Sequence, residues 1–416
     1  MVELTSGYLP NGAGMTKKNI NSTAGKVSIL RQLCNHIPAH VLPKLVREHK
    51  SEGHAREFSH WSQVVTLLYS KISHSFGLND LCDQMDIHSG SLAAIRSATP
   101  ARRNTLSHAG KVRPAAIAEG LFWATLKHLR EQSPGFGRRP FPGRLRKLNR
   151  TIELMDSTVI ELVANCMNWA SHRRNKAAAK CHLRMNFETL LPSCAIIGTA
   201  READAKRARD LTAGLKIGEI GVFDRGYVDL AHFAELTQRG VIWVTRWKDG
   251  MKADLSESRS VSGKVLADEI IRLSNGQTAR RIRALVVVDG QEREMVFLTN
   301  ALTWSAALIV ELYGCRWEIE VFFKQMKQTL KLCDFIGNSA NAIRWQIWMA
   351  LLGHLLIRYE AWLHEWTHAF TRIFALLRGV LWEKRDIGSL LNRYGTAKGN
   401  FHYLASPSQS YFPFSR

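Results

Sequence analysis

From residue 151 to about residue 247 the sequence alternates between strand-like and helix-like segments, and this alternation limits the fold more than any other feature. The segments 151–163 (TIELMDSTVIELV) and 240–247 (GVIWVTRW) are rich in β-branched and aromatic residues, as strands are. The segments 201–215 and 229–240 carry apolar residues at helical spacing instead. Strands that alternate with helices predict an α/β sheet.

The rest of the chain breaks this alternation and divides into segments of different character. Residues 25–133 read as helical, residues 134–150 are rich in Pro, Gly and Arg, and residues 248–300 combine polar turns with short strands. The sequence predicts, in chain order, a disordered N-terminus (1–24), a helical DNA-binding or accessory domain (25–133), a basic linker (134–150), the first part of the α/β domain (151–247), a β-rich insertion (248–300), the completion of the α/β domain (301–345) and a C-terminal helical region (346–416).

The charge balance indicates a polyanionic partner. The chain has 57 Lys and Arg against 36 Asp and Glu, a formal net charge of +21. Basic side chains that neutralise phosphates release condensed counterions, so such an excess favours nucleic acid. Residues 101–150 are especially basic, which suits an arm laid along nucleic acid, although a solvated linker has the same composition.

The cysteines and the apolar segments favour a cytoplasmic protein. The seven cysteines are scattered and form no CxxC pair, which argues against a disulfide framework and a structural zinc site. The N-terminus lacks the pattern of a secretory signal. The most apolar stretch, 345–359, is too short and too interrupted to span a bilayer.

Residues 311–332 predict one helix with an unusual charged stripe. Tyr313, Arg316, Glu320 and Lys327 fall within an arc of roughly 60° on a helical projection. Two further lysines, Lys324 and Lys331, extend the stripe. Two readings remain open: Glu320 forms ordinary pairs one turn away, each worth about 0.2–0.5 kcal/mol, or it binds a divalent metal while the cations bind phosphates.

Two aspartates follow apolar strand patterns in the same way. Ile152, Leu154 and Asp156 share one face of a predicted strand, and Val222 and Asp224 repeat this arrangement. An aspartate that closes an apolar strand is well placed in a cleft beyond the carboxyl end of that strand. Two such aspartates and a glutamate supply the oxygen ligands that Mg²⁺ prefers.

Three motifs together carry a resemblance to a known family. Asp156 lies in MDST, Asp224 lies in FDRGY, and Tyr313 begins the pattern Y-x2-R-x3-E-x6-K. In this order the motifs resemble the DDE transposases of the insertion-sequence-four (IS4) family, which is defined by a Tyr-Arg-Glu-Lys signature. The resemblance covers residues 150–335, and residues 59–85 resemble more weakly a leading domain often attached to such transposases.

The resemblance implies an α/β fold in which an RNase H-like catalytic domain is interrupted by the β-rich insertion and flanked by helical N-terminal and C-terminal regions. It implies that Asp156, Asp224 and Glu320 are catalytic and hold two Mg²⁺ ions, for which Mn²⁺ can substitute. The residues expected to contact DNA are Tyr313, Arg316, Lys324, Lys327, Lys331, Arg225, Lys180, His182 and Arg246.

The same resemblance implies cut-and-paste transposition. The expected partners are double-stranded transposon ends and target DNA, bound by a homodimer associated with the bacterial nucleoid, with no membrane. Two other functions stay open: a Mg²⁺-dependent nuclease without strand transfer, and a DNA-binding regulator with an inert catalytic domain. Trp243 and Trp247 are candidates for holding a flipped base, although both also suit a strand core.

Overall fold

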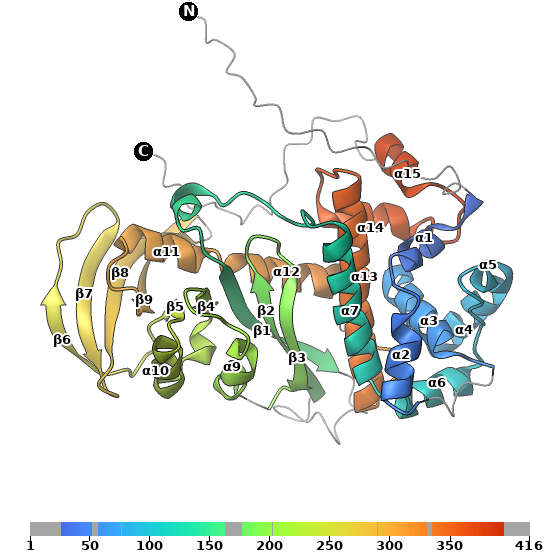
Figure 1. Cartoon of the computed structure of the whole chain (residues 1–416), viewed down its shortest axis with the longest axis horizontal. Coiled ribbons are helices and arrows are strands. Elements are labelled where there is room, and N and C mark those ends of the chain that lie inside the picture. The colour runs from blue at the N-terminus through green and yellow to red at the C-terminus, as the bar shows by residue number, and fades with distance from the viewer. Residues whose placement is uncertain are drawn as a thin grey trace, which may run out of the picture.

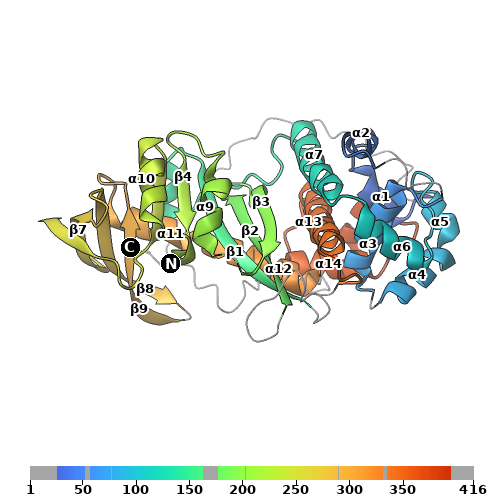
Figure 2. The same ribbon diagram turned by 90° about the horizontal axis from the view of Figure 1, so that it is seen from below.

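The computed structural model describes residues 26–51, 57–75, 77–162, 177–201, 203–288, 290–330 and 335–394. The predicted disordered segment 1–24 lies outside these residues. Figures 1 and 2 show an elongated molecule with a sheet-based body at one end and an all-helical body at the other.

The helical body is built from both ends of the chain. Its N-terminal helices are α1 (Ile29–Asn35), α2 (Val41–Glu48), α3 (His60–Ser73), α4 (Leu78–Ile87), α5 (Ser89–Ala93), α6 (Arg103–Val112) and α7 (Ala116–Gln132). Its C-terminal helices are α13 (Ala340–Leu363), α14 (Phe370–Arg378) and α15 (Ile387–Tyr394). The predicted N-terminal and C-terminal helical regions therefore pack into one unit around the long helix α13, which contacts α3, α6 and α7.

Buried polar contacts hold these two chain ends together. The Trp345 indole of α13 donates to the carbonyl of Arg113 at 2.8 Å, and the Asn341 side chain donates to the same carbonyl at 2.7 Å. The Arg113 side chain is 1% exposed and donates to the Ser59 carbonyl and to Gln63 Oε1. These bonds join the segment after α6 to both α3 and α13, and they supply acceptors for the terminal nitrogens of the buried Arg113 guanidinium.

The described residues of the other body form a nine-stranded sheet of order β3-β2-β1-β4-β5-β9-β8-β7-β6. Its strands are β1 (Ile152–Leu162), β2 (Ala177–Asn186), β3 (Pro192–Thr199), β4 (Ile220–Phe223), β5 (Ile242–Arg246), β6 (Ala253–Ser258), β7 (Val265–Leu273), β8 (Thr278–Val288) and β9 (Gln291–Thr299). Strand β1 is antiparallel to β2, and β4 is parallel to both β1 and β5.

The predicted β-rich insertion continues this sheet. Strand β9 pairs antiparallel with β5, with Val244 opposite Thr299 and Arg246 opposite Phe297. The Thr299 hydroxyl adds a 2.6 Å bond to the Trp243 carbonyl. Strands β6 to β9 therefore extend the edge at which β5 would otherwise expose unpaired backbone groups.

Helices cover the two faces of the sheet. Helices α9 (Asp204–Thr212) and α10 (Leu230–Gln238) pack on one face, and α11 (Ala306–Gly314) and α12 (Trp317–Thr329) pack on the other. The alternation of β1 produces this sandwich: Leu154 lies in the core shared with α11 and α12, whereas Met155 lies in the core shared with α9 and α10. Asp156 therefore faces α12.

Among the described residues, no helix is long and apolar enough to cross a membrane.

Candidate active site

Asp156 and Asp224 are neighbours because their strands pair in parallel. Met155 of β1 lies opposite Phe223 of β4, and each is followed by one of the aspartates. The expectation that Asp156 closes its strand is wrong, because β1 continues to Leu162 by pairing with β2. Strand β4 is shorter and ends at Phe223, just before Asp224. Asp156 therefore lies beside the space beyond the end of β4.

Local backbone groups orient both carboxylates. The backbone N–H of Ser157 donates to Asp156 Oδ1 at 2.7 Å. Asp224 caps the short 3₁₀ turn Arg225–Tyr227, since its Oδ2 accepts from the backbone N–H of Gly226 at 2.8 Å. Hydrogen bonds of this type fix the orientation of a carboxylate.

The predicted single helix over residues 311–332 is interrupted at Cys315 and Arg316. Helix α11 ends at Gly314 and α12 begins at Trp317, and the backbone between them makes tight bonds to the third residue back, such as Cys315 N–H to the Leu312 carbonyl at 3.1 Å. The two helices are therefore joined by a short stretch of 3₁₀ bonding.

The joint places Tyr313 and Arg316 on different helices and brings them together. Tyr313 is 7% exposed, and its hydroxyl accepts from Arg316 Nε at 3.2 Å. The guanidinium also lies 5.4 Å from the centre of the tyrosine ring. The Tyr313 ring is thus largely buried and its hydroxyl holds Arg316; its contact with DNA stays a prediction.

One guanidinium contacts all three predicted acids. Arg316 Nη1 lies 2.9 Å from Asp156 Oδ2 and 3.8 Å from Asp224 Oδ1, and Arg316 Nη2 lies 2.5 Å from Glu320 Oε1. Asp156 is the most enclosed of the three acids, with a side chain 13% exposed, against 35% for Asp224 and 33% for Glu320. The three acids therefore meet at one partly open place.

The electrostatics show that one cation does not balance this site. Burial raises the pKa of Asp156 to about 7, and the charges of Asp224 and Glu320 act in the same direction, while Arg316 opposes them. Three neighbouring carboxylates repel one another, so protons or additional cations are favoured there.

The donor set is suitable for hard divalent cations, but its arrangement is not yet a metal site. Among the described residues, no three His, Cys, Asp or Glu side chains are placed to hold one metal ion. The Arg316 guanidinium lies between the carboxylates, so these oxygens can share an ion only after it moves away. Carboxylate oxygens are the ligands that Mg²⁺ and Mn²⁺ prefer.

The remaining predicted cations lie in different surroundings. Lys324 is exposed and Lys327 is half-buried on α12, while Lys331 lies outside the described residues. Arg225 is exposed and pairs with Asp249 at 3.3 Å. Arg246 is half-buried, and its Nε has no hydrogen-bond partner within the described parts of the chain.

Lys180 and His182 do not face the three acids. Both lie on β2 and point to the α9 side of the sheet, where Lys180 Nζ lies 2.7 Å from Asp204. His182 is 1% exposed, and its Nδ1 lies 2.9 Å from the Tyr227 hydroxyl. The His182 ring is therefore buried on the α9 side of the sheet, and its contact with DNA stays a prediction. The sequence analysis did not predict a role for Asp204. The feature that could have pointed to it is an acidic residue at the first position of a predicted helix.

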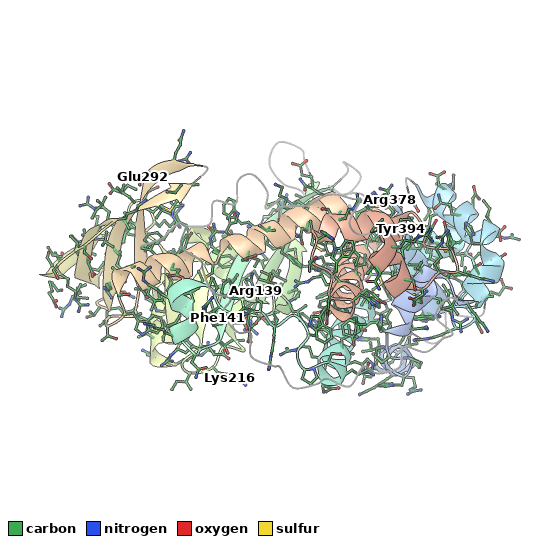
Figure 3. All side chains as sticks on the ribbon, turned by 90° about the horizontal axis from the view of Figure 1, so that it is seen from above. Arg139, Phe141, Lys216, Glu292, Arg378 and Tyr394 are labelled. Atoms are coloured by element: carbon green, nitrogen blue, oxygen red, sulfur yellow. The ribbon has the colours of Figure 1, made fainter. Side chains whose placement is uncertain are left out.

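The basic linker is attached to the catalytic face. Arg139 Nη1 donates to Glu318 of α12 at 2.9 Å, and its guanidinium lies 4.7 Å from the centre of the Phe187 ring (Figure 3). The turn Gly143–Lys147 is also attached, since the backbone N–H of Arg144 donates to Glu311 of α11 at 3.1 Å. Most basic residues of the segment 101–150, which includes this linker, are exposed. They are Arg102, Arg103, Lys111, Lys127, Arg130, Arg138, Arg144, Arg146, Lys147 and Arg150.

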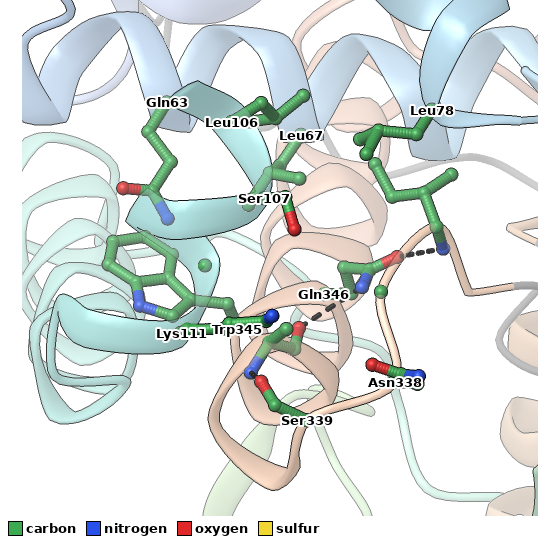
Figure 4. A pocket seen from close by; sticks show the side chains of 14 residues that line it. Gln63, Leu67, Leu78, Leu106, Ser107, Lys111, Asn338, Ser339, Trp345 and Gln346 are labelled. Carbon is green, nitrogen blue, oxygen red and sulfur yellow. Dashed lines mark hydrogen bonds between the residues drawn. The ribbon is translucent and has the colours of Figure 1, made fainter. Parts of the chain in front are cut away.

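A small cavity between the N-terminal helices and α13 is separate from the acids. Figure 4 shows Gln63, Leu67 and Trp345 among the residues around it, and its volume is about 30 Å³. That volume holds about two water molecules. Gln63 Nε2 has no hydrogen-bond partner among the described residues, so a water molecule there would satisfy a buried donor.

Three neighbouring acids beside helices and a linker rich in exposed cations are typical of enzymes that act on phosphate groups of a polyanion. Comparison with known proteins gives the family. Residues 148–356 match the Transposase DDE domain, which is half of the chain, so the chain belongs to this family. It is a DNA transposase, an enzyme dependent on divalent metal ions. Residues 26–95 match a domain of unknown function (DUF4372).

Individual relatives agree with this family. The chain is 28% identical to y4zB of Sinorhizobium fredii, described as a transposase, over 68% of this chain and 79% of that protein. It is 27% identical to a transposase for insertion sequence element IS5377 of Geobacillus stearothermophilus, over 54% and 59%. It is 23% identical to transposase InsG for insertion sequence element IS4 of Escherichia coli, over 42% of each.

Among solved structures, the chain aligns with a piggyBac transposase synaptic complex with hairpin DNA. The TM-score is 0.44 at 9% identity, over 91% of this chain and 82% of that one. This score is too low to establish a shared fold.

Proposed function

We propose that Asp156, Asp224 and Glu320 are the catalytic acids of an RNase H-like domain. Supporting this fold are the strand order β3-β2-β1-β4-β5, the antiparallel pairing of the first three strands and the parallel pairing of the rest. The observation that carries the assignment of the acids is the single Arg316 guanidinium in contact with all three.

In this proposal the three acids hold two Mg²⁺ ions, which Mn²⁺ can replace. When bound, the ions supply activation of water and then of a DNA 3′-hydroxyl, and stabilisation of the leaving oxygen in an in-line displacement. The carboxylates orient the reacting phosphate relative to strands β1 and β4 and helix α12. Positioning and charge neutralisation then supply most of the acceleration.

Arg316 has two roles in this proposal. Without metal it neutralises the acids; with metal its guanidinium turns outward and contacts a DNA phosphate. The bond from Arg316 Nε to the Tyr313 hydroxyl holds the guanidinium beside the acids in the metal-free state, and the outward movement breaks it. Guanidinium groups suit phosphate because they make two parallel hydrogen bonds.

The DNA substrate follows from the motifs and the relatives. The Tyr-Arg-Glu-Lys spacing, together with relatives named for insertion sequence elements IS4 and IS5377, supports a transposase of an IS4-family insertion sequence. It cuts the ends of the element and joins them to target DNA. A homodimer that holds two ends together is part of this proposal.

The DNA runs along the exposed and half-buried cations near the acids. Lys324 and Lys327 follow Glu320 on α12, and the basic segment around Arg139 is attached to the same helix. Arg225 lies next to Asp224 in the chain, and Arg246 ends strand β5. These contacts are to phosphates, so they contribute affinity and salt dependence rather than sequence recognition.

The function is tested with DNA that carries the ends of the element. We expect Mg²⁺-dependent nicking and strand transfer by the wild-type chain, and loss of both in Asp156→Asn, Asp224→Asn and Glu320→Gln with DNA binding retained. Asp210→Asn, an exposed acid of α9 that pairs with Arg207, is the control and keeps activity. Normal cutting by the three variants overturns the proposal, and cutting without strand transfer assigns a nuclease instead.

A further inference from the structure

A second polar cluster lies behind the proposed catalytic acids, on the other face of the sheet. Successive residues of a strand point to opposite faces, so Asp156 faces Arg316 on one side and Ser157 faces helix α9 on the other. His182 lies directly opposite Ser157 in the antiparallel pair of β1 and β2. The first residue of α9, Asp204, completes the cluster.

Asp204 is the centre of this cluster. Its Oδ1 accepts from the Ser157 hydroxyl at 2.7 Å and lies 2.7 Å from Lys180 Nζ. The same oxygen lies 3.4 Å from His182 Nδ1, which in turn lies 2.9 Å from the Tyr227 hydroxyl. One carboxylate therefore joins two strands, a helix and the turn that follows β4.

The cluster is linked to the first catalytic acid through Ser157. The Ser157 hydroxyl donates to Asp204, and its backbone N–H donates to Asp156 Oδ1 at 2.7 Å. A shift of Asp204 therefore changes the position of the residue that orients the Asp156 carboxylate. The link is short and direct, because a single residue makes both bonds.

The cluster also lies close to Gly226, in the turn that follows the second catalytic acid. A Cβ atom at Gly226 would lie 2.8 Å from Asp204 Oδ2 and 3.3 Å from Asp224 Oδ2. The two carboxylate oxygens are thus no further apart than the sum of these distances. Only glycine permits this close approach, because the first contact is shorter than a real Cβ atom allows.

We propose that Asp204 is a positioning residue of the transposase, which fixes Asp156 through Ser157 and supports the turn after Asp224 through His182 and Tyr227. This inference rests on the proposed function. Asp204 is itself paired with Lys180, so its charge is balanced on the back face and it acts through its neighbours. Lys180 then serves to hold Asp204 rather than to bind DNA.

The expected size of the effect follows from metal sites in general. Groups that orient metal ligands typically contribute about 10–100-fold to metal affinity or activity. Asp204→Asn keeps the shape of the side chain but removes the charge that pairs with Lys180. We therefore expect a 10–100-fold loss of nicking rate, a higher Mg²⁺ concentration for half-maximal nicking, and unchanged DNA binding.

The experiment compares Asp204→Asn with Asp210→Asn, an exposed acid on the same helix that pairs only locally with Arg207 in the described structure. Nicking is measured over a range of Mg²⁺ concentrations, and Mn²⁺ binding is measured by calorimetry without DNA. Weaker Mn²⁺ binding in Asp204→Asn, with Asp210→Asn equal to wild type, supports the inference. Wild-type Mn²⁺ binding and Mg²⁺ dependence in Asp204→Asn overturn it.

A second pair of variants tests the inference if Asp204→Asn fails to fold. Ser157→Ala removes the hydroxyl that bonds Asp204 and the Tyr227 side chain, and Ser157→Thr restores a hydroxyl at the same place. A positioning role predicts that Ser157→Ala loses activity at least 10-fold and that Ser157→Thr recovers most of it. Equal activity of the two overturns the inference. Asp156→Asn is included throughout, since its activity would overturn the proposed function instead.

Discussion

The guanidinium of Arg316 lies 2.9 Å from the Asp156 carboxylate, although 160 residues separate them in the chain. This contact closes the space between β1 and α12, and Arg316 reaches the other two acids from the same position. The arginine is thus the counterion of the acids, and metal ions must compete with it.

Replacing Arg316 by Gln should make the protein less stable without metal and more responsive to metal. Removing one partner of a buried pair costs about 3–5 kcal/mol, and less where the pair is partly exposed, because the remaining charges are left unbalanced. Added Mg²⁺ binds only the folded state and restores stability by mass action. In thermal unfolding, the rise in Tm with Mg²⁺ should be larger in Arg316→Gln than in wild type. Lys324→Gln is the control, and an equal rise in all three proteins contradicts the competition.

The buried ion pair of the β insertion should be important for stability. Arg280 makes two 2.7 Å bonds to the Asp268 carboxylate, and the two side chains are 3% and 7% exposed. Asp268→Asn leaves a buried guanidinium without its counterion and should cost about 3–5 kcal/mol of unfolding free energy. Glu269→Gln breaks the adjacent, more exposed pair with Arg281 and should cost about 1 kcal/mol or less. Urea unfolding measures both, and equal costs would contradict this difference in burial.

Stability should depend on pH through the carboxylate of Glu360 in the helical body. Glu360 lies 2.6 Å from His36 Nε2 and 3.2 Å from His364 Nε2. Burial acts to raise the pKa of Glu360, but the two histidines outweigh it and lower this pKa to about 2. The hydrogen bond to Glu360 raises the pKa of His364 above its ordinary value of 6.5.

The sign of the pH effect follows from these two shifts. Stability from Glu360 is present above its unfolded pKa of 4.5 and is lost as the pH falls towards 2. Stability from His364 is present below pH 6.5 and is lost as the pH rises through its raised pKa. Urea unfolding from pH 5.5 to 8.5 should show a decline that His364→Asn flattens and that the exposed control His108→Asn leaves unchanged. An identical slope in His364→Asn is the opposing result.

The two tryptophans considered for base stacking should behave differently. Trp243 is fully buried, stacks on Phe233 at 4.5 Å and donates to Thr237, whereas Trp247 is half-buried and lies 5.2 Å from the Arg281 guanidinium. Trp243→Ala should cost about 3–5 kcal/mol of unfolding free energy, and Trp247→Ala clearly less. Of the two, only Trp247 has surface for a flipped base. Chemical denaturation compares them, and a similar cost for both would show that Trp247 is also core.

Much of the sheet could be predicted from the sequence. The strand patterns around Asp156 and Asp224, the helices between them and the strands of the insertion agree with β1 to β9, α9 and α10. These segments are predictable because the period of their apolar residues is set locally. The apolar face of α12 was predictable for the same reason, and Ile319 and Met326 on it are fully buried.

The parts that could not be predicted depend on contacts between distant segments. Asp156 lies inside β1 because β2 supports the strand beyond it, and no local pattern shows which partner strand is longer. The joint at Arg316 follows from the need to reach the acids from the end of α11. His182 alternates with Lys180 as a surface residue would, and only the position of α9 covers it.

Metal binding by the three acids is the central claim, and calorimetric titration of Mn²⁺ without DNA tests it most directly. The wild-type chain and the control Glu318→Gln should bind Mn²⁺ with equal affinity, whereas Asp156→Asn, Asp224→Asn and Glu320→Gln should each lose most of the binding. Wild-type binding that persists in all three variants would contradict the account, because the ions would then be held by other residues.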